Sequence, residues 1–203
     1  MNPLEINIPE KRPVQFLFSV AESAQIPRAS YKEIAFCGAS NVGKSSLLNA
    51  LCRQKNLART SKTPGRTQLL NFFAGPPETV LVDVPGYGFA LAPDDVRKSW
   101  SPLLLDYLES RQNMLKVALL FDARRFLRVQ DLDVVRLLQD FALPYFFVVT
   151  KLDKLNKTEG ELLQKRIAEQ MGESCEVILT SAKSRSGVDA LDWVVRDWCA
   201  PKK

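Results

Sequence analysis

One short stretch of the chain combines the residue types and the spacing that bind phosphate groups. It starts with a glycine, has a second glycine near its end and closes on a Lys-Ser pair, and its residues are Gly38, Ala39, Ser40, Asn41, Val42, Gly43, Lys44 and Ser45. Glycine lets the backbone curl so that several N–H groups point at phosphate oxygens. Lys44 can reach the β- and γ-phosphates of a nucleotide, and the Ser45 hydroxyl can ligate Mg²⁺. The spacing predicts a phosphate-binding loop, and the alternative is a chance match to a short pattern.

The residues around this loop predict the elements that position it. Residues 34–37 are an apolar run, and residues 47–51 have the pattern of a helix. A strand, a glycine-bounded loop and a helix form the context that the motif requires. The helix would direct the positive end of its dipole at the bound anion.

Polar residues that end apolar runs are the next candidates, because ligands of parallel sheets bind at the carboxyl ends of the strands. The first such group is Asp83-Val84-Pro85-Gly86. Asp83 can hold Mg²⁺ through water, and the N–H of Gly86 can contact a γ-phosphate. The alternative is that Pro85-Gly86 is only a turn.

The second group is Thr150-Lys151-Leu152-Asp153, which follows the apolar residues 146–149. A carboxylate at Asp153 can accept both the ring N–H and the amino N–H of guanine, a pair of donors that adenine lacks. The stem of Lys151 can lie over the phosphate-binding loop. The alternative is the solvated start of a helix.

Two further segments supply candidates for the same site. A backbone N–H can bond the guanine carbonyl oxygen from the segment that follows the apolar residues 177–179, which is Thr180, Ser181 and Ala182. Nucleotide contacts are also expected just before and at the start of the second strand, from Gly65, Arg66, Thr67, Gln68 and Leu69. Thr67 is the candidate for a second Mg²⁺ ligand because of its place between the phosphate-binding loop and Asp83.

The basic residues of the chain are concentrated near these candidates. No acidic residue occurs between residues 34 and 77, and the whole chain has a net charge of +5. Residues 55–66 lack a periodic apolar pattern, which predicts a mobile loop. Its positive charges either present a surface to RNA or only offset the charge of a bound nucleotide.

The amino-acid composition excludes several classes of protein and of catalytic site. The 203 residues are 46% hydrophobic and 25% charged, which is typical of a soluble globular domain. Histidine is absent, which excludes Ser-His and Cys-His catalysis and His-ligated zinc. The four cysteines have neither metal-site nor disulfide-scaffold spacing, so we expect reduced thiols. Residues 1–18 lack the pattern of a signal peptide and no apolar run reaches 18 residues, so we expect a cytoplasmic protein without a membrane partner.

The apolar periodicity predicts the organisation of the chain. Residues 1–13 are expected to be a flexible tail and residues 14–203 a single domain, which begins with a short helix at 14–25. Apolar runs alternate with amphipathic segments after residue 94, which indicates a parallel sheet covered on both faces. We therefore expect an α/β fold in three layers, with a six-stranded, mostly parallel sheet that has one antiparallel edge strand. The antiparallel pair is expected at residues 68–74 and 79–83.

These motifs, in this order, resemble the EngB/YihA/YsxC family of bacterial GTPases, within the translation-factor class. Thr150 in place of the usual asparagine of GTPases is itself common in that family, whereas histidine is more usual where Arg125 stands. The resemblance implies a P-loop GTPase fold, Mg²⁺-dependent binding of GTP and GDP, and slow GTP hydrolysis. It also implies a monomer that binds the large ribosomal subunit during its assembly, with a link to growth, cell division and septation.

The expected mechanism is positioning and charge neutralisation. Lys44, Thr67, Asn41 and Gly86 are the candidate catalytic residues. Many GTPases place a glutamine after Asp-x-x-Gly, and here Tyr87 stands there, so we expect slow intrinsic turnover. In similar GTPases an asparagine at the place of Asn41 helps to hold K⁺, which predicts faster hydrolysis in K⁺ than in Na⁺.

Several alternatives stay open from the sequence. Arg66 can act as an arginine finger instead of K⁺, or contact a phosphate or RNA. Residues 55–66 and 86–95 flank the expected γ-phosphate and are candidate switches. A P-loop ATPase is one rival function. The other is a non-catalytic assembly module that binds RNA or the ribosome in a nucleotide-dependent way.

Overall fold

The computed structural model describes residues 14–28, 31–58, 69–75, 79–87, 102–111, 115–125, 127–172 and 175–200. The predicted tail at 1–13 and most of the predicted mobile loop at 55–66 lie outside these residues. The predicted helix that starts near residue 94 is described only as α3, Pro102–Glu109.

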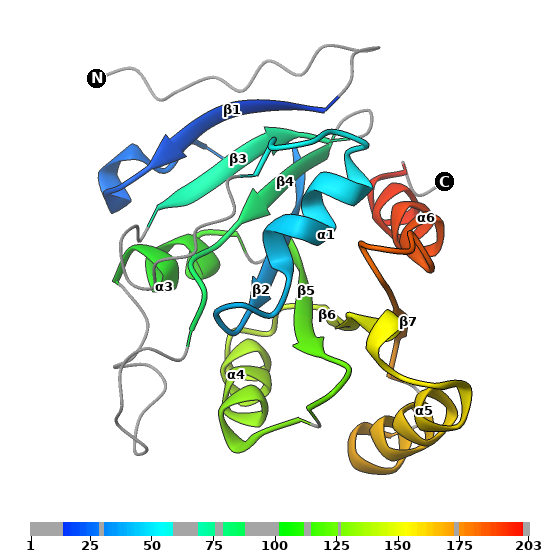
Figure 1. Ribbon diagram of the computed structural model, residues 1–203. Coiled ribbons are helices and arrows are strands. Elements are labelled where there is room, and N and C mark those ends of the chain that lie inside the picture. The colour runs from blue at the N-terminus through cyan, green and yellow to red at the C-terminus, as the bar shows by residue number, and fades with distance from the viewer. Residues whose placement is uncertain are drawn as a thin grey trace.

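The described residues form one seven-stranded sheet with the order β1-β3-β4-β2-β5-β6-β7 (Figure 1). Its strands are β1 Gln15–Val20, β2 Lys32–Gly38, β3 Leu70–Ala74, β4 Thr79–Asp83, β5 Leu115–Asp122, β6 Tyr145–Thr150 and β7 Val177–Leu179. The strands from β4 to β7 in this order are parallel, and β3 is antiparallel to both β4 and β1. The predicted α/β class and the predicted antiparallel pair are confirmed.

Helices cover both faces of the sheet. They are α1 Lys44–Leu51, α3 Pro102–Glu109, α4 Val129–Asp140, α5 Lys157–Met171 and α6 Val188–Cys199. Successive residues of β2 point to opposite faces, as in any strand. Ile34 and Phe36 join the core beneath α1 and α6, which lie side by side (Figure 1), whereas Ala35 joins the core beneath α3, α4 and α5. Burial on both faces explains why the strands read as continuous apolar runs.

The predicted helix at residues 14–25 is wrong. This segment forms strand β1 and a short 3₁₀ turn, Ser23–Gln25. Strand β1 pairs with the free edge of β3, where Phe18 stacks on Phe72 with ring centroids 4.9 Å apart and Phe16 meets Phe73 edge-on. The sheet consequently has seven strands rather than six, and β1 rather than the antiparallel strand β3 forms the edge. The apolar run is too short for periodicity to separate a strand from a helix.

The strand register brings the predicted site residues to one edge of the sheet. Asp83 at the end of β4 lies opposite Phe36 near the end of β2. Asp122 at the end of β5 lies opposite Thr150 at the end of β6. The carboxyl ends of four parallel strands therefore meet along one line, which is where ligands bind in such sheets. None of the described helices is both long and apolar enough to cross a membrane.

Candidate functional site

The phosphate-binding loop turns the chain from β2 into α1, as the spacing predicts. Asn41 and Gly43 adopt positive φ angles of 62° and 109°, and Gly43 is the residue before the first turn of α1. A Cβ added to Gly38 would lie 2.9 Å from the carbonyl oxygen of Leu120, so the first position accepts only glycine without a shift of β5. These two glycines let the loop curl tightly around the start of α1.

The segment after β4 runs along this loop. The Tyr87 N–H donates to the carbonyl oxygen of Gly38 at 3.3 Å, and the Ser40 N–H donates to that of Tyr87 at 3.2 Å. Between them, a Cβ added to Gly86 would lie 3.3 Å from the Gly38 carbonyl oxygen and the Ser40 nitrogen. The structure thus brings Asp83, Val84, Pro85 and Gly86 directly beside the loop, as the sequence predicts.

Lys44 and Asp83 form an ion pair at the start of α1. Their side chains are only 12% and 11% exposed, and the Lys44 ammonium also donates to the carbonyl oxygen of Val84 at 2.6 Å. The Ser45 hydroxyl belongs to the same first turn of α1. A carboxylate and a hydroxyl are hard oxygen ligands that suit Mg²⁺. The described parts of the chain contain no group of three or more acidic or cysteine side chains that could hold a metal.

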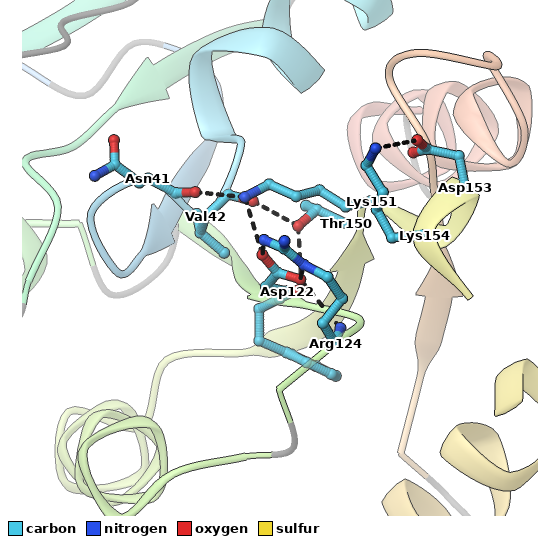
Figure 2. A network of polar contacts seen from close by, with 9 residues as sticks. Asn41, Val42, Asp122, Arg124, Thr150, Lys151, Asp153 and Lys154 are labelled. Atoms are coloured by element: carbon cyan, nitrogen blue, oxygen red, sulfur yellow. Dashed lines mark hydrogen bonds and ion pairs between the residues drawn. The ribbon is translucent and has the colours of Figure 1, made fainter.

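Thr150 and Lys151 both hold the phosphate-binding loop (Figure 2). The buried Thr150 hydroxyl lies 2.6 Å from the carbonyl oxygen of Val42 and 3.1 Å from that of Phe121. The Lys151 ammonium donates to the carbonyl oxygen of Asn41 at 2.7 Å. Its Cε atom lies 3.4 Å from the place of a Cβ on Gly43. The lysine stem therefore lies over the loop, as predicted, and the threonine holds the loop through the carbonyl oxygen of Val42.

Asp153 is held by a serine from the segment after β7. The Ser181 hydroxyl donates to Asp153 Oδ1 at 2.7 Å, and this hydrogen bond is the main reason that the pKa of the carboxyl is lowered. The Leu152 N–H donates to the carbonyl oxygen of Thr180 at 3.0 Å, which joins the two segments. Asp153 is consequently an ionised acceptor at neutral pH, as recognition of guanine donors requires.

The backbone of the last segment is already partly engaged. The Thr180 N–H donates to Val149 at 2.7 Å, and the Ser181 N–H donates to Ser186 at 2.9 Å. Among the described residues no hydrogen bond uses the Ala182 N–H. Of the three predicted donors to a guanine carbonyl oxygen, Ala182 is therefore the one whose N–H has no other acceptor in the described part of the chain.

Asp122 is a site residue that the sequence reasoning did not select. Its carboxylate accepts hydrogen bonds from Arg124 Nε at 2.9 Å, Arg124 Nη2 at 2.6 Å and Lys151 Nζ at 2.9 Å (Figure 2). Burial raises the pKa of this carboxyl, but the hydrogen bonds from Arg124 and Lys151 outweigh it and hold the pKa well below its usual range. Asp122 ends an apolar strand, which is the same signal that selects Asp83.

Tyr87 occupies the position after Asp-x-x-Gly and points into the core. Its side chain is buried, and its hydroxyl donates to Asp131 of α4 at 2.8 Å. Burial and the neighbouring Asp131 raise the pKa of this phenol well above its ordinary value, so the hydroxyl stays protonated. The side chain at this position therefore anchors the segment to α4.

Four candidates lie outside the described residues, namely Gly65, Arg66, Thr67 and Gln68. Leu69 is partly buried directly before β3. The roles of Thr67 as a Mg²⁺ ligand and of Arg66 as an arginine finger stay predictions.

Comparisons with known proteins agree with this geometry. Residues 33–151 match the family model described as "50S ribosome-binding GTPase". The chain is 44% identical to a probable GTP-binding protein EngB of Geotalea daltonii, over 88% of this chain and 86% of that protein. It is 45% identical to a probable GTP-binding protein EngB of Rhodospirillum rubrum, over 87% of this chain and 80% of that protein.

Solved structures share the fold. A crystal structure of a probable GTP-binding protein engB has a TM-score of 0.62 and 22% identity, over 82% of this chain and 98% of that one. The crystal structure of a point variant of Aquifex aeolicus Era bound to GDP.AlF4- has a TM-score of 0.61 and 22% identity, over 84% of this chain and 57% of that one. The family match over residues 33–151 and the relatives at 44–45% identity show that the chain belongs to the EngB family of GTP-binding proteins, within the 50S ribosome-binding GTPases.

Proposed function

We propose that this protein binds GTP and GDP with Mg²⁺, hydrolyses GTP slowly and acts as a nucleotide-dependent switch in assembly of the large (50S) ribosomal subunit. The observation that carries the proposal is the convergence of four separate segments on one rim of the sheet. Lys44 pairs with Asp83, Lys151 holds the loop at Asn41, and Ser181 holds Asp153. A nucleotide placed along this rim would meet metal, phosphate and base ligands in the order of the strands β4, β2 and β6.

On the phosphate side, Lys44 exchanges Asp83 and Val84 for the β- and γ-phosphate oxygens of the nucleotide. Mg²⁺, ligated by Ser45 and Thr67, supplies the charge neutralisation that phosphoryl transfer requires. Asp83, freed from the lysine, would hold the metal through water. The proximity of Lys44, Asp83 and Ser45 at the start of α1 supports this exchange.

On the base side, Asp153 selects guanine by accepting two N–H donors at once. The variant Asp153→Asn offers a donor where guanine needs an acceptor, so its preference shifts from GTP towards xanthosine triphosphate. A competition titration with GTP, ATP and xanthosine triphosphate measures this. Displacement of GTP by ATP at similar concentrations, with no effect of Asp153→Asn, would favour the P-loop ATPase instead.

Slow hydrolysis follows from the residues near the γ-phosphate position. Tyr87 is occupied with Asp131 and offers nothing to orient an attacking water. The Asn41 amide is exposed and points away from the Lys151–Asp122 network in Figure 2, which leaves it available to hold K⁺ near the phosphates. We expect faster phosphate release in KCl than in NaCl, and loss of this difference in Asn41→Ala. Equal rates in the two salts for the unaltered protein would remove Asn41 from this role.

The cellular part of the proposal is action in the cytoplasm as a monomer, with effects on growth, cell division and septation. The decisive experiment measures nucleotide affinity and phosphate release with and without large ribosomal subunits. We expect subunits to bind more tightly with a GTP analogue than with GDP. A second candidate, a non-catalytic assembly module, is favoured by the buried Tyr87 and predicts no phosphate release even when subunits are present.

A further inference from the structure

A pocket of about 130 Å³ lies beside the phosphate-binding loop, between its outer side, the end of β5 and the start of α4. The charged side chains that line it are Asp122, Arg124, Arg125, Arg128, Asp131 and Lys151. Loop residues 39–42 and Lys151, which are nucleotide-site candidates, form one wall of the pocket, whereas Lys44, Ser45 and Asp153 do not line it. The pocket is therefore a neighbour of the nucleotide site that shares the loop with it.

The charge of the pocket favours an anion. Four cationic side chains face two carboxylates. Arg124 is paired with Asp122 but is still 49% exposed, and Arg128 lies 3.4 Å from Asp131 and is 40% exposed. Arg125 is exposed, and its guanidinium makes no ion pair or hydrogen bond with the rest of the described chain. Arg125 thus contributes a positive charge that no described side chain neutralises.

We propose that this pocket binds a phosphate group of an RNA backbone, with Arg125 as the main contact and Arg124 and Arg128 beside it. A volume of about 130 Å³ is large enough to admit one phosphate group. Guanidinium groups match phosphate geometry because their planar donors bind two oxygens at once. The inference rests on the proposed function, since the large ribosomal subunit supplies the RNA.

The same contacts link this pocket to the nucleotide. Asp122, the partner of Arg124, also holds Lys151, which bonds the carbonyl oxygen of Asn41 in the loop (Figure 2). Asp131, the partner of Arg128, also holds Tyr87, the residue that follows Gly86. A phosphate that draws the two arginines away from these carboxylates changes the restraint on both segments that contact the γ-phosphate. RNA affinity and nucleotide affinity are then coupled reciprocally.

The test compares Arg125→Glu with Arg136→Glu. Arg136 carries the same charge as Arg125 and lies in helix α4. Its side chain is 73% exposed, pairs with Asp133 and does not line the pocket. Binding is measured over a range of KCl concentrations to intact large subunits and, separately, to protein-free large-subunit rRNA. Fluorescent GDP binding confirms that each variant is folded, because neither Arg125 nor Arg136 is among the proposed nucleotide ligands.

We expect Arg125→Glu to weaken binding to both particles by about tenfold or more and to reduce the salt slope by about one, as for loss of a phosphate contact. Arg136→Glu should stay within about twofold of the unaltered protein. Equal effects of the two variants, or none from Arg125→Glu, would overturn the inference and leave the proposed function standing. Loss of binding to intact subunits with unchanged binding to rRNA would assign the pocket to an acidic protein partner. An unaltered protein that binds neither particle would overturn both proposals.

The coupling has its own readout. The affinity of the unaltered protein for protein-free rRNA should differ by at least about fivefold between its complexes with GDP and with a GTP analogue, within the usual range of allosteric coupling. In Arg125→Glu this difference should shrink towards one. A ratio that stays the same in the variant would overturn the link between the pocket and the nucleotide.

Discussion

The Thr150 hydroxyl donates to the carbonyl oxygen of Val42 at 2.6 Å, although the two residues lie 108 positions apart in the chain. The threonine ends β6 and the valine belongs to the phosphate-binding loop. The same hydroxyl lies 3.1 Å from the carbonyl oxygen of Phe121 at the end of β5. One side chain thus ties two strand ends to the loop, in a position where most GTPases carry an asparagine.

Thr150→Val should destabilise the protein and weaken GDP binding. Valine keeps the shape but removes the one O–H donor, so the carbonyl oxygen of Val42 loses its partner, at a cost of about 1–3 kcal/mol in the free energy of unfolding. Thr150→Ser keeps the hydroxyl and is the matched control. Urea unfolding and fluorescent GDP titration measure the two effects. If valine and serine variants bound GDP equally well, the hydroxyl would have no part in holding the loop.

Lys151→Met should weaken GDP binding by about tenfold or more, because the charge-assisted hydrogen bond to the Asn41 carbonyl oxygen is lost. Methionine keeps the apolar stem over the loop, so the change isolates the ammonium. Lys157→Met is the control, since that side chain is 92% exposed at the start of α5. Equal Kd values for the two variants in a fluorescent GDP titration would contradict this role.

Asp122→Asn should weaken GDP binding, as Lys151→Met does. The substitution removes the negative charge that orients the Lys151 ammonium. The two effects should not add: a double-mutant cycle should give a coupling energy of about 0.5–3 kcal/mol, as for residues in one network. Kd values for the four proteins of the cycle measure it. Full additivity would show that Asp122 acts on the nucleotide without Lys151.

Ser181→Ala should make GDP binding more sensitive to acid. The Ser181 hydrogen bond is the main reason that the pKa of Asp153 is lowered. The stability that this lowered pKa gives to the folded protein is present above the unfolded pKa of the carboxyl and is lost as pH falls through its folded pKa. Without the hydroxyl the pKa rises towards its ordinary value, and GDP affinity should begin to fall at a higher pH. Ser184→Ala, which leaves the bond to Asp153 in place, is the control. Superimposable pH profiles of Kd for the two variants would contradict this.

Tyr87→Phe should lower the free energy of unfolding by about 1–2 kcal/mol, because the buried hydrogen bond to Asp131 is lost. Turnover of saturating GTP should change little, since the hydroxyl faces α4 and the core. Thermal unfolding and phosphate release measure the two quantities on the same preparations. A large fall in turnover with unchanged stability would mean that the phenol acts on the nucleotide.

The sequence predicts strands correctly where a long, continuous apolar run marks them. The apolar runs of β2, β5 and β6 are buried on both faces, so their composition alone marks them as strands of a parallel sheet. The short run at β1 was misassigned because its structure depends on pairing with β3, some 50 residues later, where Phe18 stacks on Phe72. Sequence periodicity carries no information about that partner.

The chain's sequence by itself determined the phosphate-binding loop, the positions of Lys44, Asp83 and Asp153, and the strands that bring them to one edge, because these follow from residue type and local spacing. Only the tertiary structure decided which side chains meet around these groups. Asp122 finds Lys151 across 29 positions, and Tyr87 finds Asp131 across 44. Such pairs form because neighbouring strands end side by side, and the order of strands in a sheet is set by packing of the whole chain.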